Sequence, residues 1–170
     1  MRDKDKLFLI DGMALIYRSY YAMIRNPLTS STGLNTSAIF GFINSTLKLI
    51  KDENPQYIAI VLDTKAKTFR HKIYSDYKAT RKPMPEDLAE QIKPLYSIFE
   101  KINIPVYKKD GYEADDILGT ISNYFHNTGI ETYILSSDKD LMQLVKEDVF
   151  VYTPGNNFVE SKVYTENEVF

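Results

Sequence analysis

Three aspartates stand where short apolar runs of this 170-residue sequence end. Asp11 and Asp63 directly follow such runs, and Asp138 follows a third run after two serines. Short, continuous apolar runs are typical of buried strands in a parallel sheet, and the carboxyl ends of parallel strands lie along one edge. We therefore expect these three carboxylates to converge at that edge.

Four more acids are predicted near the same edge. Glu113, Asp115 and Asp116 stand at the start of a predicted helix, and Asp140 follows Asp138 by two residues. Helical spacing places Glu113 and Asp116 on one side of the first turn and directs Asp115 about 100° away, toward a neighbouring strand end. The predicted cluster therefore has these members: Asp11, Asp63, Glu113, Asp115, Asp116, Asp138 and Asp140.

A cluster of this size would be strongly repulsive unless cations lie between the carboxylates. Oxygen-only ligands favour Mg²⁺ or Mn²⁺, and the two histidines, His71 and His126, have no spacing typical of a zinc site. More than four acids exceed the usual needs of one ion, so two ions are expected, a pair that can activate water for phosphodiester hydrolysis. Each acid alone has a structural alternative, as a helix cap or a partner of loop amides, and only their coincidence favours metal.

A basic segment, residues 65–82, holds seven Lys and Arg residues against one acid, whereas the rest of the chain holds 14 basic and 22 acidic residues. Within it, Arg70, Tyr77, Lys78 and Arg81 interleave cations with aromatic rings. This composition neutralises phosphates while rings stack on exposed bases. A helix here would place Lys78 and Arg81 on one face, where they could clamp a phosphate. The alternative is a solvated basic loop with partly buried aromatic residues.

The elements that position these residues alternate between strands and helices. Apolar runs predict parallel strands at residues 7–10, 57–62, 104–107 and 132–135, with a fifth at 149–152. Periodic apolar positions predict helices at residues 37–50, 86–101, 114–125 and 139–145. This order predicts one α/β domain over residues 1–170, with a doubly wound, mostly parallel central sheet and helices on both faces.

The composition indicates a globular protein, with 44% hydrophobic and 13% aromatic residues and a net charge of −2. The sequence has no cysteine, which excludes a thiolate nucleophile and a cysteine-based zinc site. Its N-terminal apolar run is too short for a signal peptide, and no stretch is long enough for a membrane span. We therefore expect a cytoplasmic protein with no membrane partner.

Together these residues resemble the 5′ nuclease domain of bacterial DNA polymerase I, in the flap endonuclease superfamily with its PIN-like fold. The resemblance covers the whole chain. Its most specific motifs are Gly111-Tyr112-Glu113-Ala114-Asp115-Asp116 and Ser137-Asp138-Lys139-Asp140. It also rests on Leu9-Ile10-Asp11-Gly12 with Tyr17-Arg18, Val61-Leu62-Asp63, and Tyr77-Lys78-Ala79-Thr80-Arg81 with Pro83-Met84-Pro85.

The resemblance implies a 5′→3′ exonuclease or flap endonuclease that hydrolyses phosphodiester bonds of DNA in replication and repair. It implies a first ion held by Asp11, Asp63, Glu113 and Asp115. It implies a second ion held in part by Asp115, Asp138 and Asp140. The role of Asp116 stays open between a metal ligand and a residue that surrounds the ligands.

The resemblance also implies how nucleic acid is bound. Arg18, Lys78 and Arg81 are expected to contact the scissile or 5′ phosphates, with Lys78 and Arg81 stabilising the developing charge, and Tyr77 is a candidate for stacking. Arg70 is a further candidate contact with nucleic acid. The expected partner is DNA with a 5′ end or flap, bound by a monomer that is fused to a polymerase in the full-length protein.

The family continues beyond this length with a helical DNA-binding region and further metal-ligand aspartates. The chain is therefore expected to be a truncated catalytic domain, and two ions are expected only in the complete domain. Two other functions stay open: a nucleic-acid-binding module without activity in this fragment, and a PIN-type ribonuclease, since nothing here reads a 2′-hydroxyl. A phosphatase of small molecules is disfavoured, because Asp11-Gly12-Met13 has no second aspartate two residues on.

Overall fold

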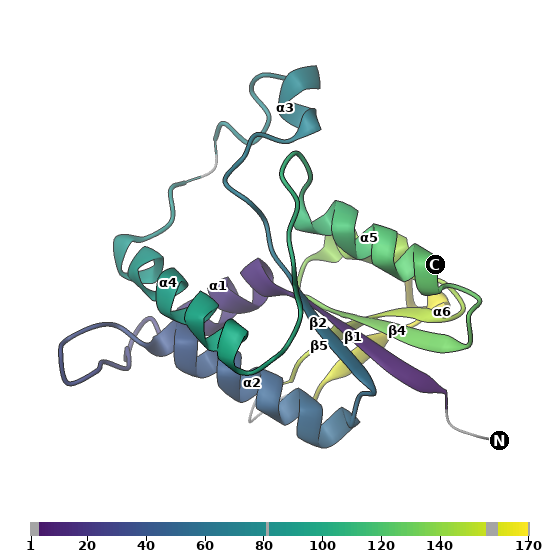
Figure 1. The fold of residues 1–170 in the computed structure, drawn as a ribbon, viewed down its shortest axis with the longest axis horizontal. Helices are drawn as coiled ribbons and strands as arrows, with labels where there is room; N and C mark the ends of the chain where they lie inside the picture. Colours follow the sequence, from purple (N-terminus) through teal and green to yellow (C-terminus); the bar gives the residue numbers. More distant parts are fainter. Residues whose placement is uncertain (1–3, 81, 156–159, 170) are drawn as a thin grey trace.

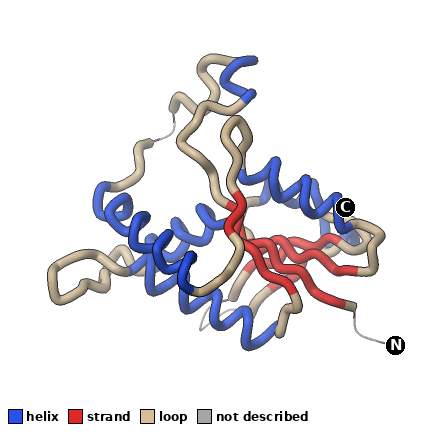
Figure 2. The backbone as a smooth tube through the Cα atoms, viewed as in Figure 1, coloured by secondary structure: helices blue, strands red, loops and turns tan. Residues whose placement is uncertain are grey.

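One six-stranded sheet forms the centre of the computed structural model, in which residues 4–80, 82–155 and 160–169 are described (Figures 1 and 2). The strand order is β3-β2-β1-β4-β5-β6. The strands are β1 (Asp5–Asp11), β2 (Tyr57–Val61), β3 (Val106–Tyr107), β4 (Ile130–Leu135), β5 (Val149–Thr153) and β6 (Lys162–Tyr164). All pairs from β3 to β5 are parallel, and β6 pairs with β5 in the antiparallel sense. The predicted doubly wound, mostly parallel sheet is confirmed.

Helices cover both faces of this sheet, as predicted. They are α1 (Gly12–Ala22), α2 (Ser37–Glu53), α3 (Phe69–Ile73), α4 (Glu86–Lys101), α5 (Ala114–Phe125) and α6 (Glu166–Val169), with a 3₁₀ helix, η1, at Lys139–Leu144. Figure 1 shows α1, α2 and α4 on one side of the strands and α5 on the other. α3 stands clear of both layers, beside the turn that leads into α5.

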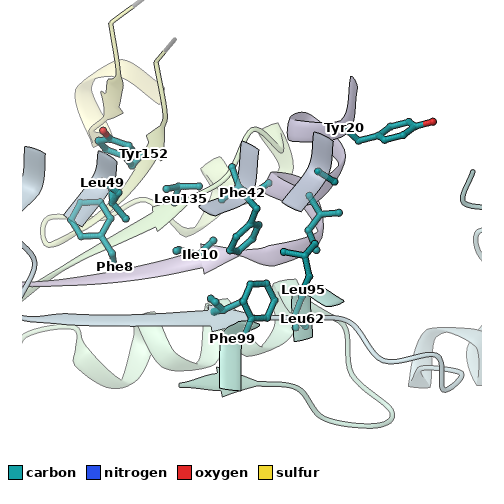
Figure 3. Packing of buried hydrophobic residues seen from close by; sticks show 14 of the residues in the cluster. Phe8, Ile10, Tyr20, Phe42, Leu49, Leu62, Leu95, Phe99, Leu135 and Tyr152 are labelled. Atoms are coloured by element: carbon teal, nitrogen blue, oxygen red, sulfur yellow. The ribbon is translucent and has the colours of Figure 1, made fainter. Parts of the chain in front are cut away.

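The side chains of β1 divide the core into two layers. Phe8 and Ile10 pack with the residues of α1, α2 and α4, whereas Leu7 and Leu9 pack with those of α5. This alternation follows from the two-residue period of a strand. Figure 3 shows the first layer, in which the rings of Phe42 and Phe99 lie with centroids 4.8 Å apart. Burial on both faces explains why the strands have continuous apolar sequences.

Several elements differ from the predictions. The elements α1, α3, α6 and β6 were not predicted, and the predicted helix at residues 139–145 is a 3₁₀ helix. β3 is shorter than the predicted strand at residues 104–107, because Pro105 has no N–H to donate to the sheet.

The basic segment also differs from its prediction. α3 ends at Ile73, residues 75–80 form turns, and Lys78 has a positive φ of 59°. A right-handed helix cannot include that conformation, so the helix that would have placed Lys78 and Arg81 on one face does not form at Lys78. Arg81 itself lies outside the described residues.

Candidate functional site

Acidic side chains line a cleft of about 1010 Å³ at the carboxyl edge of the sheet. The carboxylate cleft is defined here by Asp11, Asp63, Asp115 and Asp138. Asp11 is the last residue of β1, while Asp63 and Asp138 lie just beyond β2 and β4. Because these three strands are parallel neighbours, their ends meet, and the predicted convergence of the three aspartates is confirmed.

Asp11 is buried at the point where the chain passes from β1 into α1. Its Oδ1 accepts a hydrogen bond from the Ala14 N–H at 3.1 Å and thereby caps α1, and its Oδ2 accepts one from Ser136 Oγ at 2.8 Å. The next residue is glycine because the backbone passes close to β2. A Cβ on Gly12 would lie only 2.4 Å from the Leu62 side chain.

Asp63 and Asp138 are exposed on the rim, and each is anchored through one oxygen. Asp63 Oδ1 accepts from the Ala114 N–H at 2.8 Å, and Asp138 Oδ1 accepts from the Asp140 N–H at 2.9 Å. One oxygen of each aspartate therefore has the structural role that was the alternative to metal binding, because it accepts from a backbone amide. Within the described residues, these bonds leave Oδ2 of both aspartates free of hydrogen-bond donors.

The electrostatics of the cleft favour a cation. Burial, followed by the negative charges of Asp11, Asp138 and Asp63, raises the pKa of Asp115 to about 6, while Lys78 acts in the opposite direction. Burial is also the main cause that raises the pKa of Asp11, with contributions from Asp63 and Asp138. A divalent cation in this cleft would relieve both the repulsion and the loss of hydration.

The donor set fits Mg²⁺ or Mn²⁺, because the acidic side chains that line the cleft, Asp11, Asp63, Glu113, Asp115 and Asp138, offer carboxylate oxygens. As placed, no three Asp, Glu or His side chains of residues 4–80, 82–155 and 160–169 are arranged to hold one ion together. Asp63 and Asp138 are exposed and can rotate about their side-chain bonds. The cleft therefore matches a cation in chemistry, while these carboxylates would have to turn toward it.

Glu113 also lines the cleft, but its charge is already paired with the basic segment. Its Oε1 accepts a hydrogen bond from Lys78 Nζ at 2.8 Å, and its Oε2 accepts one from the Tyr77 hydroxyl at 3.0 Å. Glu113 is 6% exposed, so these partners replace much of its hydration. These contacts place Tyr77 and Lys78 at the acidic edge of the sheet.

Asp116 faces away from the carboxylate cleft and pairs with Arg70. Arg70 Nη1 donates to Asp116 Oδ2 at 2.7 Å, and Arg70 Nη2 donates to Oδ1 at 2.8 Å. Asp116 Oδ2 also accepts from the Glu113 N–H at 2.9 Å and so caps the start of α5. These bonds, led by that with Arg70, lower the pKa of Asp116 below its usual value. The fork is a strong, geometrically specific contact.

Two of the seven acids, Asp116 and Asp140, are not among the described side chains that line the carboxylate cleft. The place of Asp140 on the same rim as Asp138 stays a prediction. Asp116 points to Arg70 because one residue of helix turns its side chain about 100° from that of Asp115. Asp140 lies exposed on η1, and the described residues give its carboxylate no hydrogen-bond or ion-pair partner. Arg18 donates to the carbonyl oxygen of Pro154, a contact with protein that would have to open for a phosphate to take its place.

Two residues in or beside the cleft were missed in the sequence. Ser136 is 1% exposed and donates to Asp11, and its position between a strand and Asp138 was the available signal. Tyr96 on α4 lines the cleft as well, and burial, followed by the charge of Asp63, raises its pKa. No local pattern indicates Tyr96, because only the packing of α4 on the sheet brings it there.

The fold and the site define a class of protein, namely α/β domains with a carboxylate-lined cleft at the carboxyl edge of a mostly parallel sheet. The family model described as "5'-3' exonuclease, N-terminal resolvase-like domain" matches residues 6–170. The chain belongs to this family.

Curated relatives agree with this assignment. The chain is 43% identical over 156 residues to a 5'-3' exonuclease of Aquifex aeolicus, an alignment that covers 92% of the chain and 53% of the relative. It is 39% identical over 165 residues to DNA polymerase I of Caldicellulosiruptor bescii, covering 95% of the chain and 19% of that protein. The chain thus spans about half of the first relative and about a fifth of the second.

Solved structures share the fold. A structure of bacteriophage T5 5'-exonuclease with bound divalent metal ions (zinc) matches with a TM-score of 0.68 at 19% identity, over 94% of this chain and 58% of that chain. A variant of the T5 flap endonuclease in a pseudo-enzyme-product complex with DNA and metal ions matches with a TM-score of 0.66 at 19% identity, over 94% and 57%. At this identity, the likeness shows that the fold is shared.

Proposed function

We propose that this chain is the metal-binding part of a 5′ nuclease that hydrolyses phosphodiester bonds of DNA. The observation that carries the proposal is the convergence of Asp11, Asp63, Asp115 and Asp138 in one cleft, with the ammonium group of Lys78 on the same cleft. Membership of the 5'-3' exonuclease family supports it. The activity is proposed for this chain because the chain spans only part of its relatives.

The four cleft aspartates would hold a divalent ion, Mg²⁺ or Mn²⁺ by the oxygen-only donor set. Glu113 would join them once it exchanges Lys78 for the ion, and Asp140 would join Asp138 at a second ion. The metal-bound T5 5'-exonuclease, which shares the fold, supports a divalent cation here. When bound, such ions polarise phosphate oxygens and activate water.

The basic segment would bind the phosphates of the substrate. Lys78 Nζ lies 2.8 Å from Glu113, so it is already at the edge of the cleft where a scissile phosphate would have to enter. Its charge would stabilise the negative charge that develops on the phosphate during hydrolysis. The ring of Tyr77, which donates to Glu113 from the same turn, would stack on a base near that phosphate.

The proposed substrate is DNA with a 5′ end or flap, in line with the DNA complex of the T5 flap endonuclease. Fusion to a polymerase, a monomeric state and a cytoplasmic location stay predictions. None of the helices in the described residues is long and apolar enough to cross a membrane.

Single-turnover cleavage of a labelled 5′-flap DNA, with the chain in excess, tests the proposal. We expect product with Mg²⁺ or Mn²⁺, none in chelator, and a rate at least about 100-fold lower for Asp115→Asn, which removes a charge from the cation site. Lys51→Ala, which removes an exposed cation at the end of α2 that does not line the cleft, is the matched control and should cleave at nearly the parental rate. Cleavage that is unaffected by both chelator and Asp115→Asn would overturn the proposal.

A further inference from the structure

Arg70 and Asp116 lie at the joint between the basic segment and α5. We propose that their ion pair is a clasp that positions the basic segment, and through it Lys78, over the carboxylate cleft. In this role Arg70 does not contact DNA and Asp116 does not bind a metal ion. The inference rests on the proposed function, because it assigns Lys78 to substrate phosphate.

The geometry of the pair is that of a fixed joint. Both terminal nitrogens of Arg70 donate to Asp116, at 2.7 and 2.8 Å, and the Glu113 N–H donates to the same carboxylate at 2.9 Å. Three of the roughly four acceptor positions of the carboxylate are therefore occupied by protein. The Arg70 and Asp116 side chains are only 31% and 21% exposed. A phosphate or a cation would have to break this arrangement to reach either residue.

The position of Asp116 separates it from the cation site. Asp115 lines the carboxylate cleft, whereas Asp116 lines a second hollow between α5 and the β2 side of the sheet. The two adjacent carboxylates thus serve different hollows on different sides of one helix. Asp116 is placed to hold Arg70, and Asp115 is placed to hold a cation.

The contacts around Arg70 explain how the pair acts on Lys78. α3 stands clear of the two helical layers (Figure 1), and its start is tied to the turn before α5 by a hydrogen bond from the Phe69 N–H to the Gly111 carbonyl at 3.0 Å. The Arg70 guanidinium lies 4.6 Å from the centre of the Phe69 ring, which stabilises its orientation. Lys78, eight residues on from Arg70, ends the tethered stretch at Glu113.

The conformation of the segment requires such a tether. Lys78 has a positive φ of 59°, a backbone conformation that is unfavourable for residues other than glycine. In the described residues, the turns that present Lys78 have backbone hydrogen bonds only from Tyr77 to Tyr74 and from Ala79 to Asp76. Two turn hydrogen bonds hold the backbone weakly. The orientation of Lys78 therefore depends on the contacts at the two ends of the segment, Arg70 with Asp116 and Lys78 with Glu113.

The test measures the loss of DNA affinity that Lys78→Ala causes in different backgrounds. It uses the 170-residue chain and a fluorescent 5′-flap DNA in chelator. In the parent, Lys78→Ala should weaken DNA binding about tenfold, the effect of losing one charge-assisted contact. In an Arg70→Lys background the same change should cost less than about twofold, because lysine keeps the charge but cannot form the fork. Lys72→Ala is the control background, in which the tenfold effect should persist.

Hydrogen exchange of the Tyr74, Tyr77 and Ala79 amides gives a second measurement that needs no DNA. The clasp predicts exchange at least about tenfold faster in Arg70→Lys and in Asp116→Asn than in the parent, with no change in Lys72→Ala. Equal exchange in all four proteins would overturn the clasp, as would a tenfold Lys78 effect that persists in Arg70→Lys. A parent chain that binds no DNA would contradict the proposed function instead, and the exchange rates would still decide the clasp.

Discussion

Asp115 and Asp116 are consecutive residues of α5, yet their surroundings are opposite. Burial and three neighbouring carboxylates raise the pKa of Asp115 to about 6. The Arg70 guanidinium is the main cause that lowers the pKa of Asp116. The helix turns about 100° between them, which is enough to direct one carboxylate into an acidic cleft and the other into a fork of donors.

The difference corresponds to the two roles that we propose for these acids, cation binding for Asp115 and holding the basic segment in place for Asp116. Charges gathered without partners cost stability until a ligand arrives, and such arrangements are typical of functional sites. Charges matched by a fork of donors hold segments in place whether or not a ligand is bound. The acidic motif at residues 111–116 therefore combines part of the proposed cation site with the proposed joint that carries the basic segment.

The largest expected effect on stability comes from breaking the ion pair between Asp116 and Arg70. Asp116→Ala removes both the partner of Arg70 and a cap of α5, and we expect it to lower the free energy of unfolding by about 2 kcal/mol at pH 7. Asp110→Ala, at an exposed aspartate of the turn before α5, should change the free energy of unfolding by less than about 0.5 kcal/mol. Urea denaturation measures both. A loss for Asp116→Ala no larger than for Asp110→Ala would show that the pair contributes little.

A substitution at Asp115, in the carboxylate cleft, should change stability in the opposite direction. We expect Asp115→Asn to raise the melting temperature by about 3 °C at pH 7 in chelator, because it removes a charge that burial and repulsion destabilise. A melting temperature at or below that of the parent would contradict this reading of the cleft.

The same substitution should change the dependence of stability on pH. The pKa of Asp115 is about 6 in the folded protein and near 3.8 in the unfolded chain, so the folded state binds more protons between these values. The contribution of Asp115 to stability therefore rises as the pH falls from about 7 toward 4. The advantage of Asp115→Asn over the parent should accordingly shrink over that range in thermal melts. A constant advantage would show that the pKa of Asp115 is not raised.

A smaller effect is expected from Ser136→Ala, which sharpens the comparison within the cleft. Ser136 Oγ donates to Asp11, and this bond acts to lower the pKa of Asp11. Its loss should reduce stability at pH 7 by about 0.5 to 1 kcal/mol and raise the pKa of Asp11 further. NMR titration of the Asp11 carboxyl carbon measures the shift, and an unchanged pKa would mean that the bond is not formed in solution.

The parts of the site that were predictable follow from local rules. Strand ends carry Asp11, Asp63 and Asp138 to one edge, and the helical period separates Asp115 from Asp116. The pairing of Arg70 with Asp116 spans 46 residues, and no local pattern specifies which acid a lysine- and arginine-rich segment will meet. The turns at residues 75–80 escaped prediction because Lys78 adopts a backbone conformation that its residue type disfavours.

The most direct test of the division between Asp115 and Asp116 is the affinity for Mn²⁺, measured by calorimetric titration at pH 7. Asn matches Asp in shape, so both substitutions remove a charge with little change in packing. We predict that Asp115→Asn lowers the affinity at least about tenfold, because it removes an anionic oxygen donor, and that Asp116→Asn leaves it within about twofold of the parent. Equal losses in the two variants, or a larger loss in Asp116→Asn, would contradict the account.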